Sequence, residues 1–239
     1  MNNRRTLIAA IVGGALLLGA AGLGIIYFVV FAGSSPQKLA LSSPTPSTSA
    51  STSPDSSTGA GTWTVGSGSQ AGYRVREKLA ALSAPSDAVG RTTAVTGTLT
   101  LTQASSGYSV TAANFTADVS KLSSDQSRRD QRIHSQGLES DRYPTATFTL
   151  TSPIALAADA GSGQTIHLSA TGDLTIHGVT KSVTIPIDAR LTGSTIELVG
   201  SISFPFSQFG MTPPSIGGFV SVQNTATMEF QLLLTRQGA

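Results

Sequence analysis

From Thr62 onward the chain alternates between apolar and polar residues with a period of two. Residues 183–191 read VTIPIDARL, with an apolar or small residue at every second position, and residues 226–234 continue the same parity. Successive side chains of a β-strand point to opposite faces, so this pattern predicts strands that bury one face and expose the other. About eight such segments can be counted, and we therefore expect an all-β domain.

The length and spacing of these segments favour a closed antiparallel barrel or a deep sandwich. Several run to about ten residues and are joined by short turns, such as residues 191–194. One helix is expected over residues 123–137, with Ser123 or Ser124 as its N-cap, lying on the surface or across a barrel end. An eight-stranded barrel is either filled by its own side chains or encloses one ligand. Small residues near the inward parity, among them Gly97, Ala112 and Gly200, favour the enclosed ligand.

The N-terminal region has a different composition. Residues 7–31 are almost wholly apolar, follow Arg4 and Arg5, and are long enough to cross a bilayer as a helix. The positive-inside tendency then predicts a cytoplasmic N-terminus and an extracytoplasmic C-terminal domain. A cleaved signal peptide, including a twin-arginine signal, is the alternative, although its apolar core would be expected to be shorter.

Residues 34–61 are predicted to be a linker between this anchor and the barrel. The stretch 42–58 is mainly Ser and Thr interrupted by Pro, a composition that cannot bury enough surface to form a core and that is compatible with O-glycosylation. The expected organisation is a cytoplasmic tip and transmembrane helix at 1–33, a disordered linker at 34–61 and a barrel at 62–239. The chain has no cysteine, so the domain must be stable outside the cytoplasm without disulfides.

Charge and residue types exclude several classes of function. The formal net charge of +2 arises from Arg4, Arg5 and Lys38 against Asp55, which leaves the barrel region neutral and argues against nucleic-acid binding. His167 and His177 are predicted to face outward, without the converging donors that a metal site needs, and His177 is expected to shape the turn at 176–179. There is no nucleophile motif. We expect no catalysis, cofactor or metal, and the sequence indicates no particular oligomeric state.

Four segments carry a resemblance to a known family. The chain has Trp63 followed by SQAGY at 69–73, DVSKLSSDQSRRDQRIHSQGLESDRYPTATF at 118–148, GDLTIHGVTKSVTIPI at 172–187, and SQFGM at 207–211. In content and order these segments resemble the YceI-like family of lipocalin-like, polyisoprenoid-binding proteins. The family's late loop commonly has Arg-Ser-Asp-Phe-Gly, whereas this chain has Phe206 and Gln208 at the charged positions. The loss of both charges indicates a different contact at that end.

The resemblance implies an exported barrel whose apolar interior holds an isoprenoid or another amphiphile. Inward-facing apolar residues are then the candidates for ligand contact, since each Å² of apolar surface removed from water contributes about 25 cal/mol. For each of them, filling a core is the competing role. The candidate lining residues are Phe115, Phe148, Leu174, Ile185, Ile202, Phe204 and Phe230.

Three residues are candidates for the polar end of the ligand. Arg129 and Arg132 could bind an anionic head group, although the favoured role is structural, with Arg129 or Arg132 paired with Asp130 or Asp118 to fix the helix across the barrel mouth. Asn224 interrupts the apolar parity of the last strand and could touch a polar group of the ligand or satisfy a buried one.

A non-catalytic interaction or structural protein of the cell envelope is the second hypothesis. In that case the barrel is filled, and its outer face or the apolar loop 209–219 docks to a partner. The same loop could instead cap the barrel or approach lipid.

Overall fold

The computed structural model describes residues 35–43, 59–79, 86–105, 107–216 and 220–237. The predicted transmembrane segment and most of the predicted linker lie outside these ranges. Among the helices within them, none combines the length and the apolar character needed to cross a bilayer.

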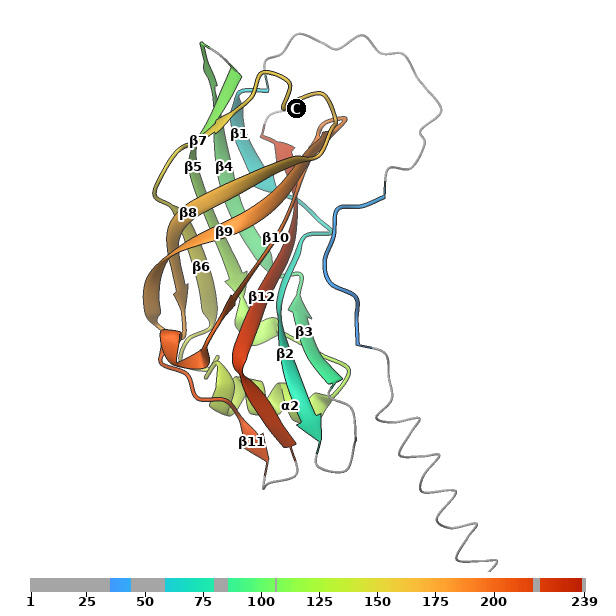
Figure 1. Cartoon of the computed structure of the whole chain (residues 1–239), viewed down its shortest axis with the longest axis vertical. Helices are drawn as coiled ribbons and strands as arrows, with labels where there is room; N and C mark the ends of the chain where they lie inside the picture. The colour runs from blue at the N-terminus through green and yellow to red at the C-terminus, as the bar shows by residue number, and fades with distance from the viewer. Residues whose placement is uncertain (1–34, 44–58, 80–85, 106, 217–219, 238–239) are drawn as a thin grey trace, which may run out of the picture. The chain divides into compact units, whose positions relative to one another are not determined.

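The described chain is dominated by antiparallel strands, as the alternation predicts (Figure 1). The strands are β1 (Gly61–Val65), β2 (Gln70–Leu79), β3 (Ser86–Thr92), β4 (Val95–Ala104), β5 (Gly107–Asp118), β6 (Thr145–Leu150), β7 (Ile154–Leu156), β8 (Ile166–Ile176), β9 (Val179–Thr192), β10 (Thr195–Phe204), β11 (Ser215–Ile216) and β12 (Val220–Arg236).

These strands close into a barrel because the long last strand pairs with the first. The order is β1-β4-β5-β6-β8-β9-β10-β12, and β12 pairs back to β1. β2 pairs with the same strand as β1, further along β12, and β3 pairs with β2. β2 and β3 therefore extend the barrel wall at one end. β7 likewise follows β6 along β5, and β11 adds a short pairing to β12. The expected eight-stranded antiparallel barrel is confirmed.

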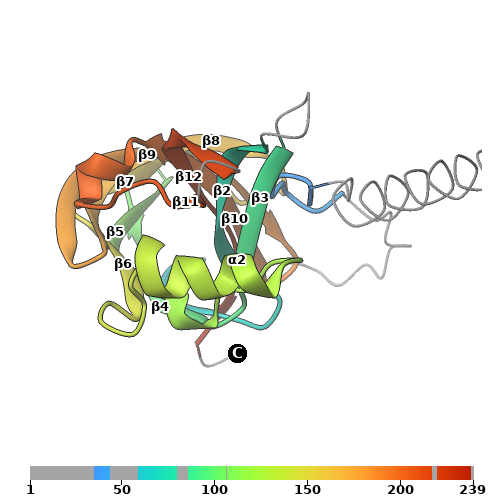
Figure 2. The ribbon, with the colours of Figure 1, turned by 90° about the horizontal axis from the view of Figure 1, so that it is seen from below.

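A short helical segment lies across one end of the barrel, which we call the helix end (Figure 2). It consists of the α-helix α2 (Ser127–Arg132) and a π-helical turn, η2 (Ile133–Gly137). The predicted start at Ser123 or Ser124 is wrong, because α2 has Gln126 as its N-cap. The Ser124 hydroxyl instead donates to a carboxylate oxygen of Asp130 at 2.6 Å, which closes a loop in front of the helix.

Two 3₁₀ turns also lie near the ends of strands. The first, η1 (Val119–Lys121), follows β5, and its N-cap Asp118 accepts a hydrogen bond from the Ser120 backbone N–H at 3.0 Å. The second, η3 (Phe206–Phe209), follows β10.

The β8–β9 hairpin turns on His177 and Gly178. Both have positive φ, 53° and 71°, as a two-residue hairpin loop of type I′ requires. His177 Nδ1 lies 3.3 Å from the Phe209 carbonyl oxygen, and its Nε2 lies 3.2 Å from a carboxylate oxygen of Glu139. His177 therefore connects the turn to η3, and the predicted outward orientation is wrong for it because its side chain is only 12% exposed. The described residues contain no cluster of three or more potential metal ligands.

The apolar core forms two groups along the barrel. The group at the helix end includes Leu174, Ile185 and Phe209, and the group toward the other end includes Trp63 and Leu234. Phe230 and Ile187 pack against both groups, so the interior is continuous from one end to the other.

Candidate functional site

Two apolar cavities lie inside the barrel. The volume within which the centre of a water molecule can lie is about 100 Å³ in the helix-end cavity and about 80 Å³ in the mid-barrel cavity. A single water needs about 10–15 Å³ in this measure, so both spaces are several times larger than a packing defect. Ala71, Ala117, Ala146 and Met228 line both cavities, which places them next to each other.

The mid-barrel cavity is shaped by aromatic rings that lie against glycines in the wall. A Cβ added at Gly97 would lie 2.7 Å from the Phe115 ring, one at Gly172 would lie 2.5 Å from the Phe148 ring, and one at Gly200 would lie 2.5 Å from the Phe230 ring. Such distances are far below van der Waals contact. The rings therefore lie against the wall, in space that a side chain at these three positions would fill.

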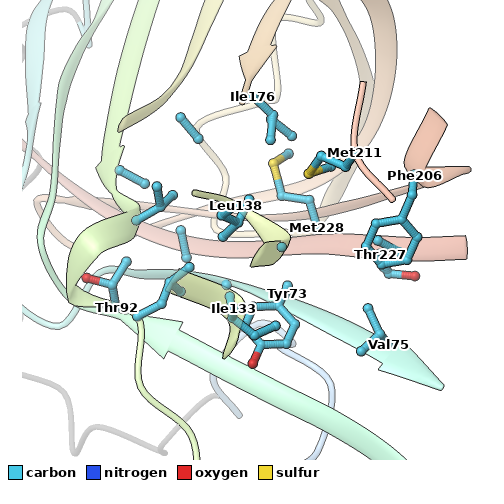
Figure 3. A pocket seen from close by; sticks show the side chains of 18 of the residues that line it. Tyr73, Val75, Thr92, Ile133, Leu138, Ile176, Phe206, Met211, Thr227 and Met228 are labelled. Carbon is cyan, nitrogen blue, oxygen red and sulfur yellow. The ribbon is translucent and has the colours of Figure 1, made fainter. Parts of the chain in front are cut away.

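The helix-end cavity is closed by side chains from outside the regular sheet. Ile133 and Leu138 come from η2 and the residue after it, and Met211 comes from the loop after η3. Figure 3 shows these side chains facing Met228 and Tyr73 around a common space. The lining at this end therefore combines strands of the barrel wall with the helical segment and the loop after η3.

An ion pair holds the helical segment to the barrel. Arg129 on α2 lies 3.1 Å from a carboxylate oxygen of Glu77 on β2 and 2.5 Å from one of Asp125. Burial by itself would lower the pKa of Arg129, but the hydrogen bonds and negative charges of Glu77 and Asp125 outweigh it and raise the pKa. The guanidinium thus stays charged and fixes α2 over the helix end.

The loop after β10 is packed into the barrel rather than exposed. Phe209 is fully buried, and its ring lies edge-on to Phe204 with the centroids 4.7 Å apart. Met211 is also buried, and Pro214 lines the helix-end cavity. The prediction of an exposed apolar docking loop is wrong for Phe209 and Met211, while Phe219 lies outside the described residues.

A third, larger space opens at the opposite end of the barrel. This mouth cavity offers about 710 Å³ in the same measure and is lined by Trp63, Tyr108 and Arg236 among others. Leu198 lines both the mouth cavity and the mid-barrel cavity. Shared lining residues therefore place the three spaces one after another along the barrel.

Comparison with known proteins identifies the family. A model of the YceI-like domain matches residues 63–234. The chain belongs to the YceI-like family. An UPF0312 protein of Vibrio campbellii is 38% identical over 82 residues, which make up 34% of this chain and 39% of the Vibrio protein. An UPF0312 protein of Vibrio vulnificus is 40% identical over 73 residues, 30% of this chain and 35% of its own length.

The barrel of this YceI-like chain also has a counterpart among solved structures. A polyisoprenoid binding domain from Saccharophagus degradans superimposes with a TM-score of 0.55 at 13% sequence identity, covering 74% of this chain and 99% of that domain. At this level of identity the similarity establishes a common fold. The matched segments of the Vibrio relatives cover well under half of those proteins.

Most of the apolar residues chosen from the sequence lie around the cavities of this YceI-like barrel. Phe204 lines the helix-end cavity, and Ile202 packs against the core at the helix end without lining either apolar cavity. The residues of this set that line the mid-barrel cavity are Phe115, Phe148, Leu174, Ile185 and Phe230.

The three residues chosen for a polar end lie elsewhere. Arg129 pairs with Glu77 and Asp125 instead of the suggested Asp130 or Asp118. Arg132 is half-buried on α2, and Asn224 is exposed where the β12 register shifts between Val222 and Ala226. None of the three lines the helix-end, mid-barrel or mouth cavity.

Several lining residues were not identified from the sequence. Ile133 and Leu138 belong to a helical stretch that reads as charged nearly all round, and Met211 belongs to the loop that was expected to be exposed. Tyr73 lies on a strand that the alternation does predict, so the alternation of inward and outward positions could have identified it as a lining residue.

The outer wall of the YceI-like domain carries buried charges. Glu229 on β12 is 3% exposed and lies 2.9 Å from Arg91 and 3.5 Å from Arg74. Glu197 on β10 is 5% exposed, accepts a hydrogen bond from Gln231 at 2.7 Å and pairs with Arg190 at 3.1 Å. Burial alone would raise the pKa of Glu197, but hydrogen bonds from Gln231 and Ser42 and the charge of Arg190 lower it below its usual value.

A short segment, 37–43, which we call the strap, is hydrogen-bonded to these polar and charged side chains of the outer wall. The carbonyl oxygens of Gln37, Ala40 and Ser42 accept hydrogen bonds from Arg91, Gln231 and Arg190 respectively. Ser42 also donates to Glu197 from both its backbone N–H and its hydroxyl, each at 2.9 Å. This part of the predicted 34–61 linker is thus hydrogen-bonded to the barrel wall.

Proposed function

We propose that this YceI-like protein binds an isoprenoid or another amphiphilic lipid inside its barrel and does not catalyse a reaction. The observation that carries the proposal is the series of neighbouring spaces inside the barrel, two of them apolar, from the helix end to the mouth. An apolar chain placed there would gain about 25 cal/mol for each Å² removed from water. A long chain could therefore be held with few polar contacts.

The relatives support the chemical class of the ligand. The Saccharophagus domain of the same fold is described as polyisoprenoid-binding. An unbranched fatty chain could pack against the same apolar walls. The cavity linings therefore support an apolar ligand, and the similarity to the Saccharophagus domain supports an isoprenoid in particular.

The alternative role as a filled interaction module has less support. It relied on an exposed apolar loop, whereas Phe209 and Met211 contribute to the core. It also relied on a filled barrel, whereas two cavities remain between the apolar side chains.

A blocking substitution tests the binding proposal. Ala146 lines both apolar cavities, so Ala146→Leu would place added methyl groups where the two spaces meet. We expect lipid recovered by organic extraction of the full-length protein, quantified by mass spectrometry, to fall severalfold. Ala104→Leu, at an exposed position of β4, is the matched control and should leave it unchanged. Absence of lipid from the unsubstituted protein, and failure to take up added isoprenoid, would refute the proposal.

We also propose that residues 7–31 anchor the protein in the cell membrane as a single pass, with the barrel on the extracytoplasmic side. The support is the length of the apolar run and the position of Arg4 and Arg5 before it. Protease added outside spheroplasts should degrade the barrel while the protein fractionates with membranes. Recovery of the barrel in the cytoplasm, or of a chain shortened at a cleavage site, would contradict this orientation or the uncleaved anchor.

A further inference from the structure

Arg236 is a cation on the inner wall of the barrel mouth. It lies at the end of β12, two residues beyond Leu234 and four beyond Leu232, which are both buried in the core group toward the mouth. Alternate residues of a strand point to the same face, so Arg236 is on the inward face as well. It is also paired with Trp63 on β1, another buried residue of that group. β1 lies at the end of the barrel opposite α2 (Figure 1).

The guanidinium of Arg236 lies against a glycine of β1. A Cβ added at Gly61 would lie 3.2 Å from Nε of Arg236 and 3.6 Å from one of its terminal nitrogens. The guanidinium therefore occupies space that a side chain at position 61 would fill. Arg236 is half-buried and lines the mouth cavity, so part of the residue remains accessible.

The chain that leads into β1 is fixed by two aromatic residues of the same lining. The backbone N–H of Gly59 donates to the Tyr108 hydroxyl at 3.3 Å, and Nε1 of Trp63 donates to the Gly59 carbonyl oxygen at 3.0 Å. Gly59, Trp63 and Tyr108 all line the mouth cavity. Hydrogen bonds within the protein therefore hold the wall beside Arg236 in place.

Charge distinguishes the mouth cavity from the two apolar cavities. The residues that line the helix-end and mid-barrel cavities include no charged one, whereas the mouth lining includes Arg190 and Arg236 and no acidic residue. Arg190 is engaged elsewhere, since its guanidinium pairs with Glu197 at 3.1 Å. Among the described residues, no carboxylate forms an ion pair with Arg236. Arg236 is therefore the cation of this lining that remains available to a ligand.

An anionic head group would need such a partner inside the barrel. Moving a phosphate or a carboxylate from water into an apolar space is strongly unfavourable unless its charge is paired. A guanidinium can bind either group through two parallel hydrogen bonds. The linings of the helix-end and mid-barrel cavities offer no cation for this purpose, whereas the mouth offers Arg236.

We propose that Arg236 binds the anionic head group of an amphiphilic ligand, a phosphate or a carboxylate, at the mouth of the barrel. The apolar chain of the ligand then occupies the mid-barrel cavity and points toward the helix end. This inference rests on the proposed function, because it specifies the head-group chemistry and the direction of a ligand in the same interior.

The test uses three probes with the same isoprenoid skeleton, the anions farnesyl phosphate and farnesoic acid and the neutral farnesol, on delipidated full-length protein. The single tryptophan of the chain, Trp63, lines the mouth cavity, so its fluorescence reports binding there. The two anions should bind more tightly than farnesol, and added salt should weaken their binding.

Arg236→Gln should weaken binding of both anions about three- to tenfold and leave farnesol binding unchanged. This loss is smaller than that for a fully buried charged hydrogen bond, because Arg236 is half-buried. Arg236→Lys keeps the charge without the bidentate geometry and should recover part of the affinity. A loss confined to one of the two anions would identify that head group. The melting temperature of the ligand-free Arg236→Gln protein should be unchanged.

Arg128→Gln is the matched control at the other end. Arg128 is exposed on α2, so removing its charge should leave all three affinities unchanged. Anion binding that weakens with Arg128→Gln and not with Arg236→Gln would overturn the proposed direction. Unchanged anion affinity in Arg236→Gln, or an equal loss for farnesol and the anions, would overturn the contact itself. If the unsubstituted protein bound none of the three probes, by fluorescence or by calorimetry, the proposed function would fail instead.

Discussion

Replacing Phe209 by alanine tests whether the loop after β10 is a structural cap or a free docking surface. The side chain is fully buried and belongs to the core group at the helix end. A Phe→Ala change in such a core costs about 3–5 kcal/mol, because the ring's apolar contacts are lost and a cavity is left. An exposed docking residue would cost almost nothing.

The edge-to-face contact with Phe204 allows part of that cost to be assigned. Aromatic pairs in this geometry contribute about 0.5–1.5 kcal/mol beyond the area they bury. Phe209→Leu retains much of the volume and loses this contact. A double-mutant cycle of Phe209→Leu with Phe204→Leu should therefore give a coupling free energy in the same range.

The assay is urea unfolding followed by circular dichroism, with thermal unfolding as a second measure. For a domain of about 150–250 residues each kcal/mol shifts the melting temperature by about 2–4 °C, so Phe209→Ala should lower it by about 6–20 °C. Ser207→Ala, an exposed change in the same turn, is the control and should stay within about 0.5 kcal/mol. A loss below about 1 kcal/mol for Phe209→Ala would refute the reasoning and restore the loop as a candidate docking surface.

Three further predictions concern the helix end, the wall and the outer charges. Arg129→Ala should lower the free energy of unfolding by about 2–3 kcal/mol, since it leaves the carboxylate of Glu77 unpaired, and adding Glu77→Gln should recover part of the loss in urea unfolding. Gly200→Ala should cost about 1–3 kcal/mol by overpacking against Phe230 and the Pro186 carbonyl, whereas Ser201→Ala at the exposed neighbouring position should be neutral in the same melting assay. Because the pKa of Glu197 is lowered on folding, its stabilising effect should be present above about pH 4.3 and be lost as the pH falls through the folded-state value. Urea unfolding of Glu197→Gln at pH 6 and pH 3.5 should therefore show a smaller acid-induced loss than the unsubstituted protein, and an equal loss would contradict this origin.

The barrel and much of its lining could be predicted because one face of each strand is buried. A period-two pattern assigns inward positions without knowledge of the pairing, and it selected Phe115, Phe148 and Leu174, all of which line the mid-barrel cavity. Long strands joined by short turns are compatible with a closed barrel or a deep sandwich, and the pairing of β12 with β1 shows that the barrel is closed. Family resemblance was needed to suggest what such an interior would bind.

The errors arise where a local feature shifts the pattern or where residues distant in sequence meet. Ala112 is exposed where β5 has one residue more than β4, between the pairs Thr100–Ala112 and Leu101–Val110. A single inserted residue of this kind moves every later side chain to the opposite face, and nothing in the residue types marks the position. Asn224 is exposed where β12 has two residues more than β2 between Val222 and Ala226, so it lies in the bulge while Val222 and Ala226 keep the same parity. The partner of Arg129 could not be chosen either, since Glu77 lies 52 residues away in the chain.

The strap has a consequence for insertions and deletions in the chain. Residues 44–58 connect two segments that both contact the domain, the strap and the stretch that leads into β1, so they close a loop. The entropy of closing a loop changes slowly with its length, by about 0.6 kcal/mol for each doubling. Homologues should therefore tolerate large length differences between 44 and 58. Within the strap, Leu39 and Leu41 are half-buried while Lys38, Ala40 and Ser42 are exposed, so a single inserted residue would exchange the two sets.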